Sequence, residues 1–205
     1  MVFLGPVWIA AVVLGAAGLG KGWRPRAATQ ALRTLGLPSS NLAARVLGAG
    51  ELALAVAVIG WGGWWLDAML GLAFLAFAFA AWRLRASDSS GAVSCGCFGR
   101  STAPVGLIHV VVNLGAVVFT GAAALAAATP SLGSVWPDLP AFGVVHLLLV
   151  AAGAAAVIAT LTVLAETRQL AKVRVESDPR IHLFGPTISR RPGRRDVAGP
   201  ADGRL

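Results

Sequence analysis

The stretch VFLGPVWIAAVVLGAAGLG, residues 2–20, contains no charged residue and is long enough to cross a bilayer of about 30 Å as an α-helix. The whole chain shares this character: 57% of its 205 residues are hydrophobic, only 13% are charged, and its mean hydropathy is +0.75. A soluble domain does not normally have this balance, so the sequence predicts an all-α integral membrane protein. Basic residues follow the stretch instead of preceding it, which favours a retained span over a cleaved signal peptide. Among them, Lys21 and Arg24 are expected to reach the lipid head groups.

Four more apolar stretches predict further helices that cross the membrane. With the first, the expected spans are 2–20, 42–60, 65–82, 105–128 and 141–165. Residues 26–36 place apolar and polar side chains on opposite sides of a helix, so a short amphipathic helix should lie on the membrane surface. The predicted architecture is a four-helix transmembrane bundle over residues 1–129, a loop and fifth transmembrane helix over 130–165, and a basic, largely disordered tail over 166–205.

The basic residues predict the orientation of these spans. All 17 lysines and arginines lie in three regions that five spans would place on one side: 5 after the first span, 3 after the third, and 9 in the tail. The positive-inside rule therefore predicts an inner (cytoplasmic) membrane protein with its N-terminus outside and the loop 86–103 and the tail in the cytoplasm. Orientation and contact with anionic membrane lipid also explain the net charge of +8, so nucleic acid is not expected as a partner.

The two cysteines of the chain, Cys95 and Cys97, lie one residue apart in the loop 86–103. A disulfide across one residue closes a small strained ring, which is easier to reduce than a structural disulfide. Arg100 follows closely, and an adjacent cation favours the thiolate that attacks a disulfide. This CxC pattern therefore indicates thiol–disulfide exchange. Burial as two small apolar side chains stays open as an alternative; a metal site is not expected, because two thiolates fill only half of a tetrahedral site.

Three polar residues inside the predicted spans are further candidates. Glu51 lies near the middle of the second span, where a carboxylate should face other helices or water. Either burial disfavours its charged form or a cation lies nearby. His109 and Asn113 lie four residues apart early in the fourth span, so they share a helix face just below the cysteine loop. His109 is apt to accept a proton from a thiol, and Asn113 to contact substrate or bridge helices. For Glu51 and His109, a role in packing and hydrogen bonding alone is the alternative.

Residues 1–129 resemble the MauE family, the methylamine-utilisation membrane proteins related to DoxX. Four features in the same order underlie the resemblance: Gly-Leu-Gly-Lys ending at Lys21, Leu37-Pro38 after the surface helix, Glu51, and Cys95-Gly-Cys-Phe-Gly. The last is the most specific. The resemblance implies a redox-associated role, which for the type protein lies in amine-dehydrogenase maturation, with Cys95 and Cys97 as the dithiol.

The chain departs from the expected family pattern at one position. Val112 stands where an arginine is expected before Asn113, so any role of that arginine is absent or taken by Arg100.

These observations predict a multi-pass membrane protein whose cysteine pair exchanges electrons with a thiol partner and supports assembly of a redox enzyme. The partner would be thioredoxin-like or of the amine-dehydrogenase type, and no hydrolase or dehydrogenase site is recognisable. Cytoplasmic thiols that serve a secreted enzyme would have to pass electrons outward, so a quinone or a thioredoxin-like protein would supply a second redox centre. The alternatives are a small proton-coupled transporter using Glu51 and His109, and a non-catalytic scaffold that recruits partners through its basic tail.

Overall fold

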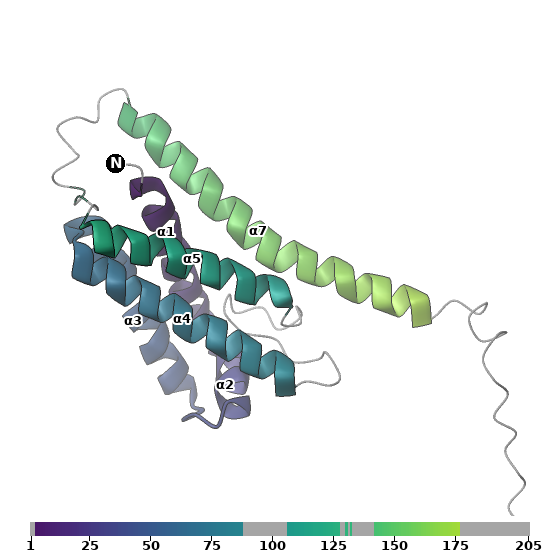
Figure 1. Ribbon diagram of the computed structural model, residues 1–205. Coiled ribbons are helices and arrows are strands. Elements are labelled where there is room, and N and C mark those ends of the chain that lie inside the picture. The colour runs from purple at the N-terminus through teal and green to yellow at the C-terminus, as the bar shows by residue number, and fades with distance from the viewer. Residues whose placement is uncertain (1–2, 88–105, 128–129, 131, 133–141, 177–205) are drawn as a thin grey trace, which may run out of the picture.

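The computed structural model describes residues 3–87, 106–127, 130, 132 and 142–176, and this part of the chain is helical with no strand. The helices are α1 (Leu4–Trp23), α2 (Pro25–Thr34), α3 (Asn41–Trp61), α4 (Trp64–Ser87), α5 (Leu107–Ala126) and α7 (Phe142–Glu176) (Figure 1). Five of them, all except α2, are long and apolar enough to cross a membrane. The structure thus confirms the predicted all-α membrane fold.

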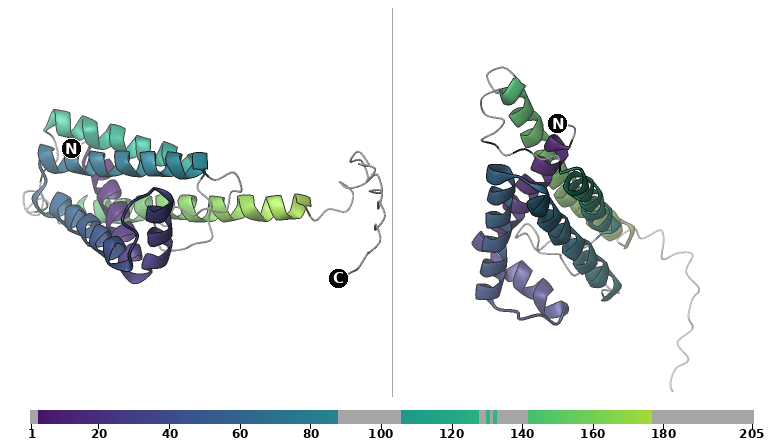
Figure 2. Two further views of the ribbon diagram at one scale, coloured as in Figure 1. Left: turned by 90° about the horizontal axis from the view of Figure 1, so that it is seen from below. Right: turned by 60° about the vertical axis from the view of Figure 1, so that its left-hand side comes forward.

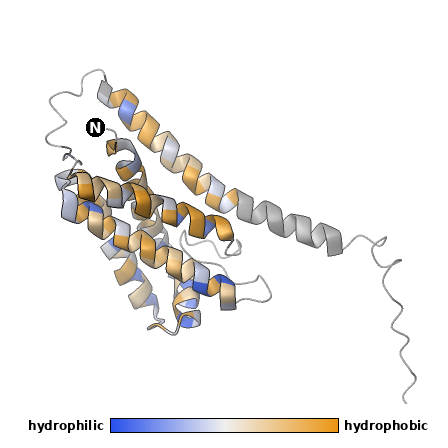
Figure 3. Cartoon of the chain, in the orientation of Figure 1, coloured by the Kyte–Doolittle hydropathy of each residue, from blue (hydrophilic) through white to orange (hydrophobic). Residues whose placement is uncertain are grey.

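The helices pack as two antiparallel pairs, α1 with α3 and α4 with α5, and α7 lies against α1 (Figures 1 and 2). At one end of the bundle α1 and α4 end and α3 and α5 begin. The short helix α2 lies there, and we refer to this end as the α2 end. Hydrophilic residues gather around α2 and the adjoining end of α4, whereas hydrophobic residues cover the rest of the bundle (Figure 3). Large apolar side chains such as those of Leu72, Val118 and Leu148 are exposed, as lipid contact requires.

Helices α1 and α3 meet along two matched rows of buried residues. The spacing within each row alternates between four and three residues, which keeps one face of each helix turned toward the other. The rows are Val7, Ala11, Leu14, Gly18 and Lys21 on α1, and Ala44, Gly48, Glu51, Ala55 and Val58 on α3.

Two glycines in these rows allow the backbones to approach closely. A Cβ atom added at Gly18 would lie 2.4 Å from the carbonyl oxygen of Gly48, and one added at Gly48 would lie 2.6 Å from the carbonyl oxygen of Gly18. Both contacts are with backbone atoms, which cannot move aside as a flexible side chain can. Because lipid tails are as apolar as leucine, helices in membranes associate through this kind of close packing of small residues.

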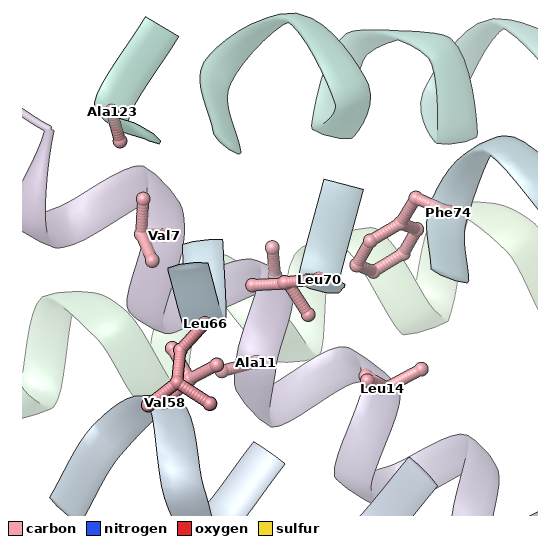
Figure 4. Close-up of a cluster of buried hydrophobic side chains, with 9 residues drawn as sticks. Val7, Ala11, Leu14, Val58, Leu66, Leu70, Phe74 and Ala123 are labelled. Carbon is pink, nitrogen blue, oxygen red and sulfur yellow. The ribbon is translucent and has the colours of Figure 1, made fainter. Parts of the chain in front are cut away.

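A cluster of buried side chains joins the two helix pairs (Figure 4). Val7 and Leu14 of α1 contribute to it from one pair, and Leu70 and Phe74 of α4 from the other. Helix α7 adds a separate contact, in which Val150 packs with Leu4 and Trp8 of α1. Helix α1 is therefore the central element, since it touches each of the other helices.

The surface helix and the end of the last helix differ from their predicted bounds. Helix α2 buries Ala28 and Ala31 and exposes Arg26 and Arg33, so its amphipathic character holds, although it ends at Thr34. Helix α7 continues to Glu176, so the first part of the predicted disordered tail, residues 166–176, is helical. The apolar run ends near residue 165, but the sequence beyond it has no glycine or proline before residue 177 and is rich in helix formers. The rest of the tail lies outside the described residues.

The close contact of α1 with α3 predicts different effects for two glycines of α3. Gly48→Ala should lower the free energy of unfolding by about 1–3 kcal/mol, because the added methyl group meets the backbone of Gly18. Gly50→Ala is the matched control, since an added Cβ at Gly50 meets nothing within 4 Å and alanine favours helix. Unfolding of the purified variants in detergent micelles measures both effects. Equal stability of the two variants would contradict the proposed role of this contact.

Candidate functional site

A buried ion pair joins α1 to α3. The Nζ atom of Lys21 donates a hydrogen bond of 2.7 Å to Oε2 of Glu51, and each side chain is only 5% exposed. The Cβ atom of a helical residue tilts toward the N-terminus of its helix, so in this antiparallel pair the two side chains lean toward each other. Glu51 therefore faces another helix, as expected, and of the two alternatives for its charge the structure shows a nearby cation. The expectation that Lys21 reaches the lipid head groups is wrong, because its side chain turns into the bundle.

The same ammonium group also contacts α4. Its Nζ atom lies 5.1 Å from the centre of the Phe77 ring, which is the geometry of a cation–π interaction. Lys21 thus connects three helices at one point. A charge at this depth is stabilised only by such partners, since lipid offers none.

His109 lies buried at the start of α5, with 4% of its surface exposed. Its Nδ1 atom accepts a hydrogen bond of 3.3 Å from the backbone N–H of Gly106, and its own backbone N–H donates to the Gly106 carbonyl at 3.1 Å. The side chain therefore caps the helix by satisfying a backbone N–H that has no partner within the helix. In the neutral ring this places the proton on Nε2.

His109 and Asn113 lie on one face of α5, where they line two cavities. The larger, of about 360 Å³, lies among α1, α4, α5 and α7. The smaller, of about 80 Å³, lies toward the α2 end and is also lined by Lys21 and by residues of α2. Phe77 borders both cavities. Phe77, His109 and Asn113 therefore form the boundary between a wide apolar cavity and a small cavity with a cation.

The redox residues predicted from the sequence, Cys95, Cys97 and Arg100, lie outside the described residues. The segment that carries them connects Ser87, the last residue of α4, to Gly106, which precedes α5. Both residues lie at the α2 end, because α4 and α5 are antiparallel (Figure 2). His109 is only three residues beyond the point where this segment enters α5. In the described part of the chain, no group of three His, Cys, Asp or Glu residues is placed to hold a metal ion.

Three polar contributions to the bundle were not foreseen from the sequence. Asp67, in the first turn of α4, is fully buried, and so is Thr120 of α5. Gly71 of α4 makes room for Thr120, because an added Cβ would lie 2.9 Å from its Oγ1 atom. The third is Lys21 as partner of Glu51. A signal for Asp67 was present, since it is the one charge in the predicted third span, 65–82.

The ion pair predicts a non-additive pattern of stabilities. Lys21→Met or Glu51→Leu should each destabilise the bundle by roughly 3–5 kcal/mol, because each leaves an uncompensated charge in a dry interior. The double variant should recover most of this loss, since it removes both charges. Arg24→Met is the control, because Arg24 is exposed, and should change stability by less than about 0.5 kcal/mol. Unfolding in detergent micelles measures all four variants, and a double variant whose loss equals the sum of the two single losses would contradict the interaction.

Comparison with known proteins agrees with the resemblance in sequence. Neither a curated protein nor a solved structure matches the chain. A family model does match: that of the methylamine utilisation protein MauE, over residues 1–129, which contain α1 to α5, the Lys21–Glu51 pair and the cysteine segment. The match covers more than half of the chain, and the chain belongs to the MauE family.

Proposed function

We propose that this membrane protein exchanges electrons between its Cys95–Cys97 pair and a thiol partner, and so supports maturation of a redox enzyme. The observation that carries the proposal is the position of the two ends of the cysteine segment. Both lie at the α2 end, where buried His109 and Asn113 adjoin the ion pair of Lys21. The segment that carries the two cysteines and Arg100 thus begins and ends at the same end of the bundle as buried His109.

Bonds and electrons balance in this exchange between the cysteine pair and a dithiol partner, and no other redox group is needed. A thiolate of the partner attacks one sulfur of the Cys95–Cys97 disulfide; the bond between the two cysteines breaks and a mixed disulfide forms. The second thiolate of the partner then attacks the mixed disulfide and forms the disulfide of the partner. Two electrons have passed from the partner to the Cys95–Cys97 pair, which is now a dithiol. Strain in the small ring favours reduction of the Cys95–Cys97 disulfide. Arg100 stabilises the cysteine thiolate that is released when this disulfide breaks.

Membership of the MauE family makes a role in methylamine utilisation the context for this exchange. The partner would then be a thioredoxin-like protein or a protein of the amine-dehydrogenase type. A proton-coupled transporter is less well supported, because Lys21 already neutralises Glu51 in a direct ion pair. A scaffold that acts through its tail is tested by truncation after Glu176, which a redox bundle should tolerate.

The two cysteines provide the direct test of the function. The Cys95→Ser/Cys97→Ser double variant should abolish oxidation of a reduced thioredoxin-like substrate while insertion and melting temperature stay unchanged. Each single variant should also lose this activity, but its remaining thiol should trap the oxidised form of the substrate as a mixed disulfide, visible on a non-reducing gel, because the second cysteine that would release the substrate is missing. Ser94→Ala, next to the motif, is the control. Full exchange activity in the double variant would refute the proposal.

The sidedness of the cysteine segment forms a second test. We propose that the α2 end faces the cytoplasm, because the lysines and arginines lie at that end, in the segment that follows α4, or in the last part of α7 and the segment after it. In intact cells, a membrane-permeant maleimide should label the cysteines after reduction, and an impermeant maleimide should not. Labelling by the impermeant reagent would reverse the proposed orientation.

A further inference from the structure

The larger cavity lies within the membrane-spanning part of the bundle, and its walls are apolar. Helix α7 packs along α1 but makes few contacts with α5 (Figures 1 and 2). The cavity lies among these three helices, and Phe74 and Phe77 of α4 complete its lining. Ile9, Val13, Phe119 and Leu161 are representative of its lining. Its apolar walls and its position among spanning helices suit an apolar ligand from the lipid.

Two polar side chains interrupt this apolar lining, and both lie on one face of α5. They are His109 and Asn113. Asn113 is half-buried in the spanning segment, and its amide makes no hydrogen bond with the residues that the structure describes. An amide without a partner in a membrane is costly. A ligand oxygen placed beside Asn113 would satisfy it.

We propose that this cavity binds a quinone, with its head group beside His109 and Asn113 and its apolar tail between α5 and α7. A quinone head is flat, uncharged and carries two carbonyl oxygens, which suits the amide donor of Asn113 and the neighbouring ring of Phe77. A phospholipid head group fits less well, because no charged side chain lines this cavity in the described part of the chain. Lys21 lines only the smaller cavity.

The quinone would act as the acceptor for the cysteine pair, and this role rests on the proposed thiol exchange. The Cys95–Cys97 dithiol loses two electrons and two protons as its S–S bond forms. The quinone takes up two electrons and two protons and becomes the quinol. The disulfide is thereby restored for another partner. Binding itself does not depend on the cysteines.

Substitution of two glycines of α5 distinguishes an effect on the cavity from a general effect on the helix. Gly115 lines the cavity, and Gly121 does not; an added Cβ meets nothing within 4 Å at either position. Gly115→Leu should fill the cavity and weaken binding of decylubiquinone about tenfold or more, whereas Gly121→Leu should bind like the unmodified chain. Asn113→Leu should weaken binding about three- to tenfold by removing a hydrogen bond. Binding is measured on the full chain in nanodiscs by quenching of tryptophan fluorescence.

The controls distinguish failure of this inference from failure of the proposed function. Equal affinity of the Gly115→Leu and Gly121→Leu variants, with both folded, would overturn the site. Displacement of decylubiquinone by n-decylbenzene at equal concentration would also overturn it, because it would show a site for alkyl chains alone. The Cys95→Ser/Cys97→Ser variant should bind decylubiquinone normally but not reduce it. Binding by the reduced, unmodified chain without quinol formation would support the site and overturn the acceptor role.

Discussion

A carboxylate inside a membrane is costly unless its charge is matched, and the pairing of Glu51 with Lys21 meets this constraint. The pair also fixes the register of α1 against α3. Successive residues of a helix are rotated by about 100°, so a shift of one residue would turn one of the two charges toward lipid. Gly18 and Gly48 add a steric condition in the same rows, since their backbones touch only in this register. Charge and shape thus select the same arrangement.

The rest of the bundle is built on this pair of helices. Through Phe77, the Lys21 ammonium also orients α4, and α4 positions α5 along the contact between Gly71 and Thr120. His109 and Asn113 are thereby held next to α1, even though α5 shares little surface with it. The chemistry proposed for the cysteine segment consequently depends on a helix arrangement that the Lys21–Glu51 ion pair helps to fix.

The sequence was sufficient to predict the fold class, because hydropathy and length alone identify helices that can cross a membrane. It was also sufficient to predict that Glu51 faces another helix, with a nearby cation as one of two alternatives. It could not identify Lys21 as that cation, since several basic residues come after the first span and only packing chooses among them. The end of α7 was missed because the apolar run stops before the helix does. The cavities could not be foreseen, because hydropathy does not show which apolar faces meet each other and which leave space. The roles of Cys95 and Cys97 stay predictions.

One wall of the larger cavity comes from α7, which lies beyond the residues that match the family. The bundle of α1 to α5 is complete without it, because the central cluster contains no residue of α7. The bundle of α1 to α5 and helix α7 can therefore change independently in evolution. Changes at Val157 or Leu161 can reshape the space next to α5 without disturbing the register of α1 and α3. Relatives that share the four-helix domain but carry a different C-terminal helix would keep the same polar face and present it to a differently shaped space.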